Sequence, residues 1–293
     1  MIQSVIEIIT QGLAVGSIYA LLALGFAMVY GVSRMSNFAH GDFAMIGAMF
    51  FATSLVGGSV PVPFAFIVVP LISAAVAVTV AWAVYRPVFS APRVNLFIVG
   101  IGTSIFLENT AIVIWGPATR PFPSLWAGQS IHIAGTVVPV FSVFIVGLLV
   151  LLTTAVSLFV LKTKAGIASR AVAQDVRTAM LMGVGVNRLI YLTFVIGGIL
   201  SGVSGVTYAM YFGITYPLMG FTPILKAFVA VVAGGIGSLP GAVLGGLVLG
   251  LTESVGARYI SSGYEDAISF GLLVAILLVR PQGILGKRRL EKV

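Results

Sequence analysis

The chain has 293 residues, of which 59% are hydrophobic and 8% are charged, with a formal net charge of +8 and no cysteine. Soluble globular domains are about 45–50% apolar and about 25% charged, so this composition excludes an ordinary soluble protein. A chain without cysteine has no disulfide, no thiol catalysis and no cysteine-ligated metal.

Apolar runs make up most of the sequence, and runs of about 18 or more residues are typical of membrane helices. We therefore predict an all-α fold, a polytopic transmembrane helical bundle of about eight or nine membrane segments, with short or broken helices near 31–41 and 223–257. A transmembrane β-barrel would show short segments of alternating polarity instead. The first run has no Lys or Arg ahead of it and is too long for a signal peptide, so we expect a retained helix. The runs cover residues 5–31, 42–57, 62–85, 94–115, 138–161, 189–212, 223–236, 241–257 and 266–280.

Basic residues concentrate in three of the breaks between these runs, and cytoplasmic loops are enriched in such residues. We therefore expect these breaks and Arg34 in the cytoplasm, with the N-terminus outside and the C-terminus cytoplasmic. Two cytoplasmic breaks must be separated by an even number of membrane crossings. Between the second break and the C-terminal one, this requires that 223–257 forms two short passes or a re-entrant hairpin, turned at "GGIGSLPGA" (234–242). The positive charge is then a positive-inside bias, and we expect no nucleic-acid binding. The residues in the three breaks are Arg86, Arg93, Lys162, Lys164, Arg170, Arg177, Arg188, Arg280, Lys287, Arg288, Arg289 and Lys292.

Small residues recur at four-residue spacing in three regions of the chain. In a membrane, this spacing lets helix backbones approach one another closely, which predicts a tightly packed bundle. The pairs are Gly12 and Gly16 (continued by Ala20), Gly198 and Gly202, Ser201 and Gly205, Gly241 and Gly245, and Gly246 and Gly250.

A polar cluster separates the first two apolar runs, where Asn37, His40 and Asp42 fall within "SRMSNFAHGDFAM". A zinc site needs three or four protein ligands, and the only other histidine lies in an expected outer loop. A proton relay needs further titratable partners, which the sequence does not show. Two interpretations stay open: a structural break in which Asn37 and Gly41 permit the turn, or irregular backbone that lines a translocation pathway.

Ionisable residues within apolar runs are functional candidates because their burial in a membrane is costly. Glu108 is either a pathway residue or an acid near the outer mouth. Lys226 either extends toward the membrane surface or faces the "GGIGSLPG" turn, which contains Gly235 and Ser238. Together with the polar cluster, these four residues are our candidates for a substrate pathway.

Other charged residues have simpler explanations. Glu253 and Arg258 are expected to be interfacial charges near an outer helix end. The segment "SGYE" fits a capping box, in which Ser262 caps the helix and Glu265 reaches back.

Catalytic and nucleotide-binding motifs are missing from the sequence. It contains no HExxH and no GxSxG, and "GGIGSLPG" lacks the Lys-Ser/Thr of a phosphate-binding loop. We therefore expect a non-enzymatic protein without metal or cofactor, which cannot hydrolyse ATP alone.

The polar stretch 162–188 contains "ASRAVAQDVRTAMLMGVGVNRL", which predicts a short amphipathic helix followed by a glycine-containing turn. Gly183 is the expected helix stop. Such a helix suits docking into a groove of a separate ATPase subunit, or it lies on anionic lipid. The candidates for ATPase coupling are Ala171, Gln174, Asp175, Ala179 and Gly183.

Together these features resemble the LivH-type permease subunits of high-affinity branched-chain amino acid ABC importers. The resemblance is nearly end to end and rests on "GSIYALLALGFAMVYGV", "NFAHGDF", "YRPV", "GTSIFLEN", "AQDVRTAMLMGV", "TFVIGG", "LKAFVAVVAGGIGSLPGA" and "PQGILG". Gln174 and Asp175 stand where the family often has Glu-Asp, and Asp42 stands where Glu also occurs.

The resemblance implies one transmembrane permease domain over 1–293, with 162–188 as its ATPase-coupling loop. The implied partners are a second, LivM-like permease, two ATPase subunits that bind the ATP, and a periplasmic or surface amino-acid binding protein. The implied role is inward movement of Leu, Ile or Val by alternating access in the bacterial inner (plasma) membrane. A urea, amide or other amino acid permease of the same superfamily is one alternative, and a stand-alone secondary transporter or channel is another.

Overall fold

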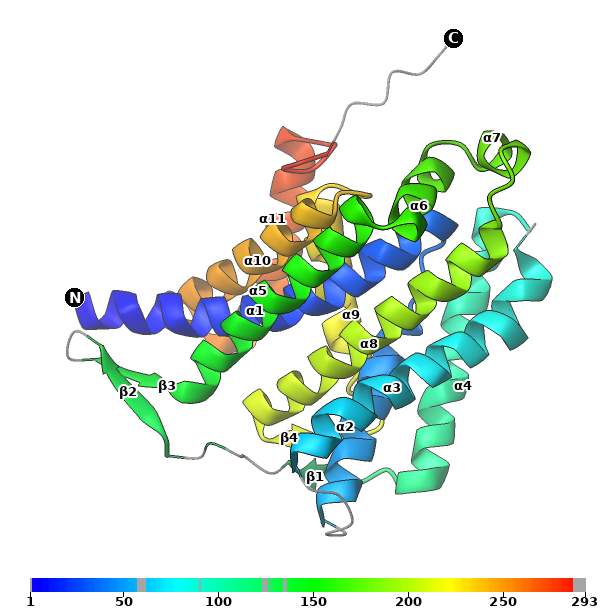
Figure 1. Ribbon diagram of the computed structural model, residues 1–293. Helices are drawn as coiled ribbons and strands as arrows, with labels where there is room; N and C mark the ends of the chain where they lie inside the picture. Colours follow the sequence, from blue (N-terminus) through cyan, green and yellow to red (C-terminus); the bar gives the residue numbers. More distant parts are fainter. Residues whose placement is uncertain are drawn as a thin grey trace.

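The computed structural model describes residues 2–56, 62–89, 91–122, 126, 128–133 and 136–286, and α-helices dominate this part of the chain (Figure 1). Lys287, Arg288, Arg289 and Lys292, which contributed to the predicted orientation, lie outside the described residues. The helices are α1 (Ile2–Ser33), α2 (His40–Val56), α3 (Val62–Val80), α4 (Arg93–Trp115), α5 (Val140–Lys162), α6 (Lys164–Gln174), α7 (Val176–Leu181), α8 (Val186–Phe212), α9 (Phe221–Gly234), α10 (Leu239–Tyr259) and α11 (Glu265–Val279). A π-helical turn, η1 (Ala81–Tyr85), and two 3₁₀ turns, η2 (Arg86–Val88) and η3 (Ser262–Tyr264), complete the helical structure.

Seven helical segments of the described chain are long and apolar enough to cross a membrane: α1, α3, α4, α5, α8, α10 and the unit of η3 and α11. The remaining apolar helices α2 and α9 have only 17 and 14 residues. A complete crossing needs about 20 helical residues, so these two helices are short membrane segments. The predicted polytopic bundle with short helices beside 31–41 and within 223–257 is therefore confirmed.

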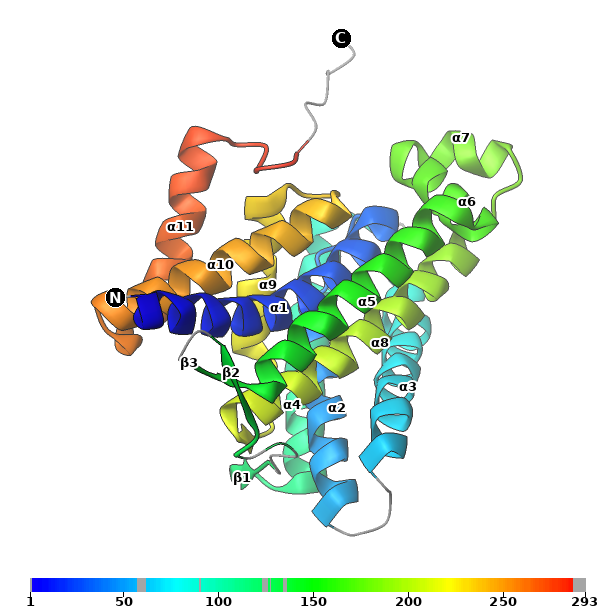
Figure 2. The same ribbon diagram turned by 60° about the vertical axis from the view of Figure 1, so that its left-hand side comes forward.

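Helix α1 is the centre of the bundle, and the small residues predicted to pack do so against α10. A methyl group added at Gly250 would lie 2.2 Å from the backbone nitrogen of Gly16, and one added at Gly246 would lie 2.6 Å from Cα of Ala20. Only glycine permits backbones to come so close, and dispersion between them replaces the hydrophobic effect as the attraction in a membrane. Figure 2 shows α1 and α10 lying side by side, with α11 outermost.

Helix α8 holds α2 by a second set of small residues. The Ser201 hydroxyl donates to the backbone oxygen of His40 at 2.6 Å, and Gly205 lies against the backbone of Ala44. From α3, the Ser73 hydroxyl donates to the backbone oxygen of Phe43 at 3.0 Å. The first turns of α2 are thus enclosed by protein and not by lipid.

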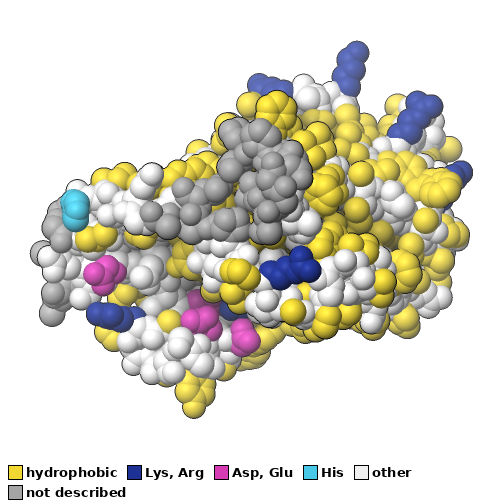
Figure 3. Space-filling model, turned by 90° about the horizontal axis from the view of Figure 1, so that it is seen from below, with side chains coloured by type: hydrophobic (Ala, Val, Ile, Leu, Met, Phe, Trp, Pro, Cys, Tyr) yellow, Lys and Arg dark blue, Asp and Glu magenta, His cyan; other side chains and the backbone are white. Residues whose placement is uncertain are grey.

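The connections lie at two opposite ends of the bundle. One end carries α6, α7, the η2 turn and residues 280–286, and the other carries the N-terminus and four short strands (Figure 1). The strands form two antiparallel pairs, β1 (Arg120–Pro121) with β4 (Ile214–Thr215) and β2 (Ser130–Ile133) with β3 (Thr136–Pro139). Figure 3 views the molecule from the side of the strands, where the acidic side chains gather on one part of a largely hydrophobic face.

The predicted capping box at the start of α11 is wrong. The Ser261 side chain, and not that of Ser262, accepts a hydrogen bond, from the backbone nitrogen of Gly263. Helix α11 begins after this 3₁₀ turn and has no side-chain cap. The sequence pattern was misplaced because η3 occupies the residues that the pattern assigned to the first helical turn.

Candidate functional site

Buried polar side chains with few partners lie in the six-residue break between α1 and α2 and in the first turn of α2. Asn37, His40 and Asp42 are each 1% exposed. The Tyr85 hydroxyl donates to Oδ1 of Asn37 at 2.8 Å, whereas Nδ2 of Asn37 has no hydrogen-bond partner in the described chain. Tyr85 lies in the π-helical turn η1, a type of helix irregularity that is frequent at functional sites. The break is therefore anchored to the end of α3.

His40 fills the space between α1 and α8. A methyl group at Gly25 would lie 2.8 Å from Nε2 of His40, and one at Gly197 would lie 3.3 Å from its Cε1. Phe26 and Phe43 contact the imidazole edge-on, and neither ring nitrogen makes a regular hydrogen bond within the described chain. This packing favours the structural interpretation for His40, since its ring is enclosed by glycines and aromatic rings.

Asp42 lies where the first turns of α2 and α9 meet. A methyl group at Gly41 would lie 2.3 Å from the backbone oxygen of Gly220, and one at Gly220 would lie 2.9 Å from Oδ1 of Asp42. Helix N-termini carry a partial positive charge, so the carboxylate of Asp42 faces two favourable dipole ends. Neither carboxylate oxygen of Asp42 has a regular hydrogen-bond partner in the described chain. The side chains of Ser104 and Glu108 on α4 are close enough to interact with this carboxyl group electrostatically. Glu108 therefore lies near the polar cluster, on α4.

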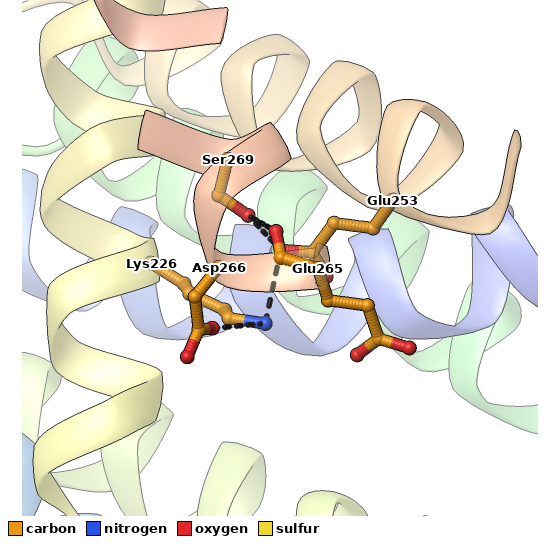
Figure 4. A network of polar contacts seen from close by, with 5 residues as sticks. All are labelled: Lys226, Glu253, Glu265, Asp266 and Ser269. Atoms are coloured by element: carbon orange, nitrogen blue, oxygen red, sulfur yellow. Dashed lines mark hydrogen bonds and ion pairs between the residues drawn. The ribbon is translucent and has the colours of Figure 1, made fainter. Parts of the chain in front are cut away.

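Lys226 lies elsewhere, in an ion network that joins α9, α10 and α11 (Figure 4). Its Nζ is 3.0 Å from Oε1 of Glu253 and 3.3 Å from Oδ1 of Asp266, and the Ser269 hydroxyl donates to Glu253. The ring of Tyr19 on α1 lies 5.3 Å from the same nitrogen. Two interpretations are therefore wrong: Lys226 does not face the α9–α10 turn, and Glu253 is a buried partner of Lys226 and not an interfacial charge.

Gly235 and Ser238 form the turn between α9 and α10, at the end of the bundle that carries α6 and α7. Gly235 has φ of +110°, which a residue with a side chain rarely adopts, and the Ser238 hydroxyl accepts from the backbone nitrogen of Gly241 at 3.1 Å. The segment "PQGILG" closes over this turn, since the backbone nitrogens of Ile284 and Leu285 donate to the last carbonyls of α9 at 2.8 and 2.9 Å. The predicted pathway residues therefore occupy three separate places.

The single helix predicted in the 162–188 loop is wrong, because two helices, α6 and α7, meet at Asp175. Asp175 has φ of −149° and ends α6, and its Oδ1 then accepts from the backbone nitrogens of Arg177 at 2.8 Å and Thr178 at 3.2 Å. The hydrogen bonds that the Asp175 carboxylate accepts, above all those from Thr178, hold the pKa of Asp175 below its usual value. Helix capping by a local carboxylate overrides the continuous helical spacing of the neighbouring residues.

The exposed tip of this loop was missed by the sequence pattern. Leu181 and Met182 are 88% and 80% exposed, and Met180 beside them is also exposed. Ala171, Gln174 and Asp175 are exposed as well, whereas Ala179 is buried against the bundle, so any effect of Ala179 on a partner is indirect. Gly183, with φ of +80°, ends the tip as predicted.

A metal site finds no support in the described residues, where no three His, Cys, Asp or Glu side chains gather around one point. A multi-pass helical bundle, two short helices that meet at their N-terminal ends, and a polar loop with an apolar tip are consistent with a membrane permease. Residues 8–277 match the family model described as branched-chain amino acid transport system / permease component, and the chain belongs to this family.

Known relatives cover nearly the whole chain. The permease protein LivH of the high-affinity branched-chain amino acid transport system of Escherichia coli is 40% identical over 97% of this chain and 96% of its own. The corresponding protein BraD of Pseudomonas aeruginosa is 39% identical over 97% of each chain. The permease protein LivM of the high-affinity branched-chain amino acid transport system of Salmonella typhimurium is 27% identical over 93% of this chain and 68% of its own. No solved structure matches this chain.

Proposed function

We propose that this chain is a permease subunit of an ABC importer that moves Leu, Ile or Val into a bacterial cell. The names of its relatives supply the substrate class, and their LivH and LivM types suggest a second, homologous permease beside it. ATP is hydrolysed by two separate subunits, and a periplasmic or surface binding protein delivers the amino acid. The chain itself has no ATPase activity.

The observation that carries the ATPase-coupled role is the α6–α7 loop. Leu181 and Met182 project from the polar α6–α7 loop at one end of the bundle, and both are exposed in the described chain. Exposed apolar patches rimmed by polar residues mark sites of contact with other proteins or with membranes, and a short helix with an apolar tip suits a groove on a partner protein. This end then faces the cytoplasm, together with Arg34 and the C-terminus, and the N-terminus faces outward.

The translocation pathway is proposed to follow the junction of α2 and α9. Broken helices whose N-terminal ends meet inside a bundle provide positive dipole ends for a carboxylate, which an amino acid carries. Asp42, with Glu108 nearby, supplies negative charge for its ammonium group. Asn37 and His40 shape the break, the Lys226 network lies toward the outer end, and the turn of Gly235 and Ser238 lies toward the inner end.

The test uses the complete transporter, in which the chain is co-produced with its second permease, ATPase subunits and binding protein. Leu181→Asp is expected to abolish ATP-driven leucine uptake and copurification of the ATPase, while the amount of chain in the membrane stays unchanged. Asn187→Asp adds the same charge at an exposed position in the first turn of α8, beside the loop, and is the matched control. Normal uptake by Leu181→Asp, or uptake by the chain without ATPase subunits, would refute the docking role. Uptake of urea in preference to leucine would refute the substrate class.

A further inference from the structure

Arg34 connects the α6–α7 loop to the break between α1 and α2. Its Nη2 donates to the backbone oxygen of Ala173 at 2.6 Å and to that of Gln174 at 3.3 Å. Both oxygens belong to the last turn of α6, where carbonyls have no partner within the helix and the helix dipole is negative. A guanidinium group is well suited to this position because it is a permanent cation with several donors.

The backbone of Arg34 also ends α1. Among the described residues that are not glycine, Arg34 alone has positive φ, at +54°. Its backbone nitrogen donates to the oxygen of Tyr30 at 2.8 Å, and the chain then turns away from the helix axis. Left-handed backbone costs about 1 kcal/mol or more in a residue with a side chain, and it persists where surrounding contacts hold it. The Arg34 side chain itself supplies one such contact, through its hydrogen bonds to the end of α6.

The loop and the break share one apolar core. Met35 and Ala39 of the break are buried in the same cluster as Val172 of α6 and Ala179 of α7, and Phe43 of α2 completes it. Close-packed clusters transmit displacements because they have little free volume. A shift of α6 therefore acts on the break through a polar link at Arg34 and an apolar contact behind it.

We propose that Arg34 is the positioning residue that transmits movement of the docked α6–α7 loop to the break, and through it to the junction of α2 and α9. Seven residues separate Arg34 from Asp42, which faces the start of α9. When the ATPase subunits close and move α6, Arg34 carries the start of α2 with it and changes the α2–α9 contact. This role rests on the proposed ATPase docking of the loop.

The test measures leucine uptake and ATP hydrolysis together in proteoliposomes that contain the complete transporter and its binding protein. Arg34→Asn removes the link but tolerates positive φ, because asparagine adopts this conformation more readily than other residues. We expect roughly tenfold less leucine transported per ATP, the size of effect expected from loss of one hydrogen bond to a charged group. ATPase copurification and ATP hydrolysis are expected to persist. Arg34→Lys keeps the cation and should restore part of the ratio.

Two controls separate transmission from stability and from charge. If Arg34→Asn does not assemble, Arg34→Gln tests the same link with a larger neutral side chain. Arg170→Asn is the control for charge, because it removes an equal charge from the exposed face of α6. An assembled Arg34→Asn or Arg34→Gln transporter with the wild-type ratio would overturn the proposal. Failure of both to assemble would also overturn it, since Arg34 would then serve folding alone. If the wild-type chain itself does not bind the ATPase, the proposed function fails instead.

Discussion

The Lys226 network predicts a strong and partner-specific loss of stability. The side chains of Lys226 and Glu253 are 7% and 4% exposed, so Lys226→Met leaves a buried carboxylate without its cation. Removal of one partner of a buried ion pair costs about 3–5 kcal/mol. At about 2–4 °C per kcal/mol for a chain of this size, the midpoint of thermal unfolding should fall by roughly 6–20 °C. Thermal unfolding of the detergent-solubilised chain, followed by circular dichroism, measures this shift.

A double variant and an exposed control variant test whether an unpaired buried charge causes this loss of stability. Lys226→Met combined with Glu253→Gln removes both charges and should recover most of the loss, because no buried charge remains unpaired. Asp266→Asn should change stability by no more than about 1 kcal/mol, since the Asp266 side chain is 69% exposed and water screens its pair with Lys226. A stable Lys226→Met variant, or a double variant no better than the single one, would show that the network is not a buried ion pair in the membrane.

Two further predictions concern packing and the pathway. Gly250→Ala should destabilise the chain by about 1–3 kcal/mol through overpacking against Gly16, whereas Gly271→Ala, with no atom within 4 Å of the added methyl group, should be neutral or stabilising in the same unfolding assay. Asp42→Asn keeps the shape of the side chain but loses up to about 2 kcal/mol of attraction to the helix ends. Leucine uptake by the complete transporter should then fall by roughly tenfold at unchanged membrane abundance; unchanged uptake would leave Asp42 with a structural role only.

Local sequence patterns predicted the membrane segments and their packing surfaces well. The length of an apolar run predicts a membrane helix because a segment in lipid must satisfy its own backbone hydrogen bonds. This requirement applies to each segment separately. The four-residue spacing in "GLAVG" and "GAVLGGLVLG" likewise identified the surfaces at which α1 and α10 touch. The same patterns did not show that these two surfaces are partners of each other, because spacing defines a helix face and not what covers it.

The candidate site was only partly predictable. Asn37, His40 and Asp42 were recognised because they are polar between apolar runs, and Glu108 because it is charged within one. The pairing of Lys226 with Glu253 was missed, since the helices that carry them run in opposite directions and the spacing of the residues in the chain holds no signal. The two helices of the loop were missed as well, since the carboxylate of Asp175 caps α7 where the spacing of apolar residues continues unbroken.

The amino-acid sequence was sufficient to predict a membrane-embedded helical bundle with small-residue packing faces, a polar loop and the motifs of its family. These properties depend on each residue and its near neighbours, so they can be read locally. Only the tertiary structure decided that α2 and α9 meet at Gly41 and Gly220, that Lys226 joins Glu253, and that Arg34 reaches the end of α6. Each of these contacts depends on how separate helices are placed in three dimensions, which is determined by the packing of the whole bundle.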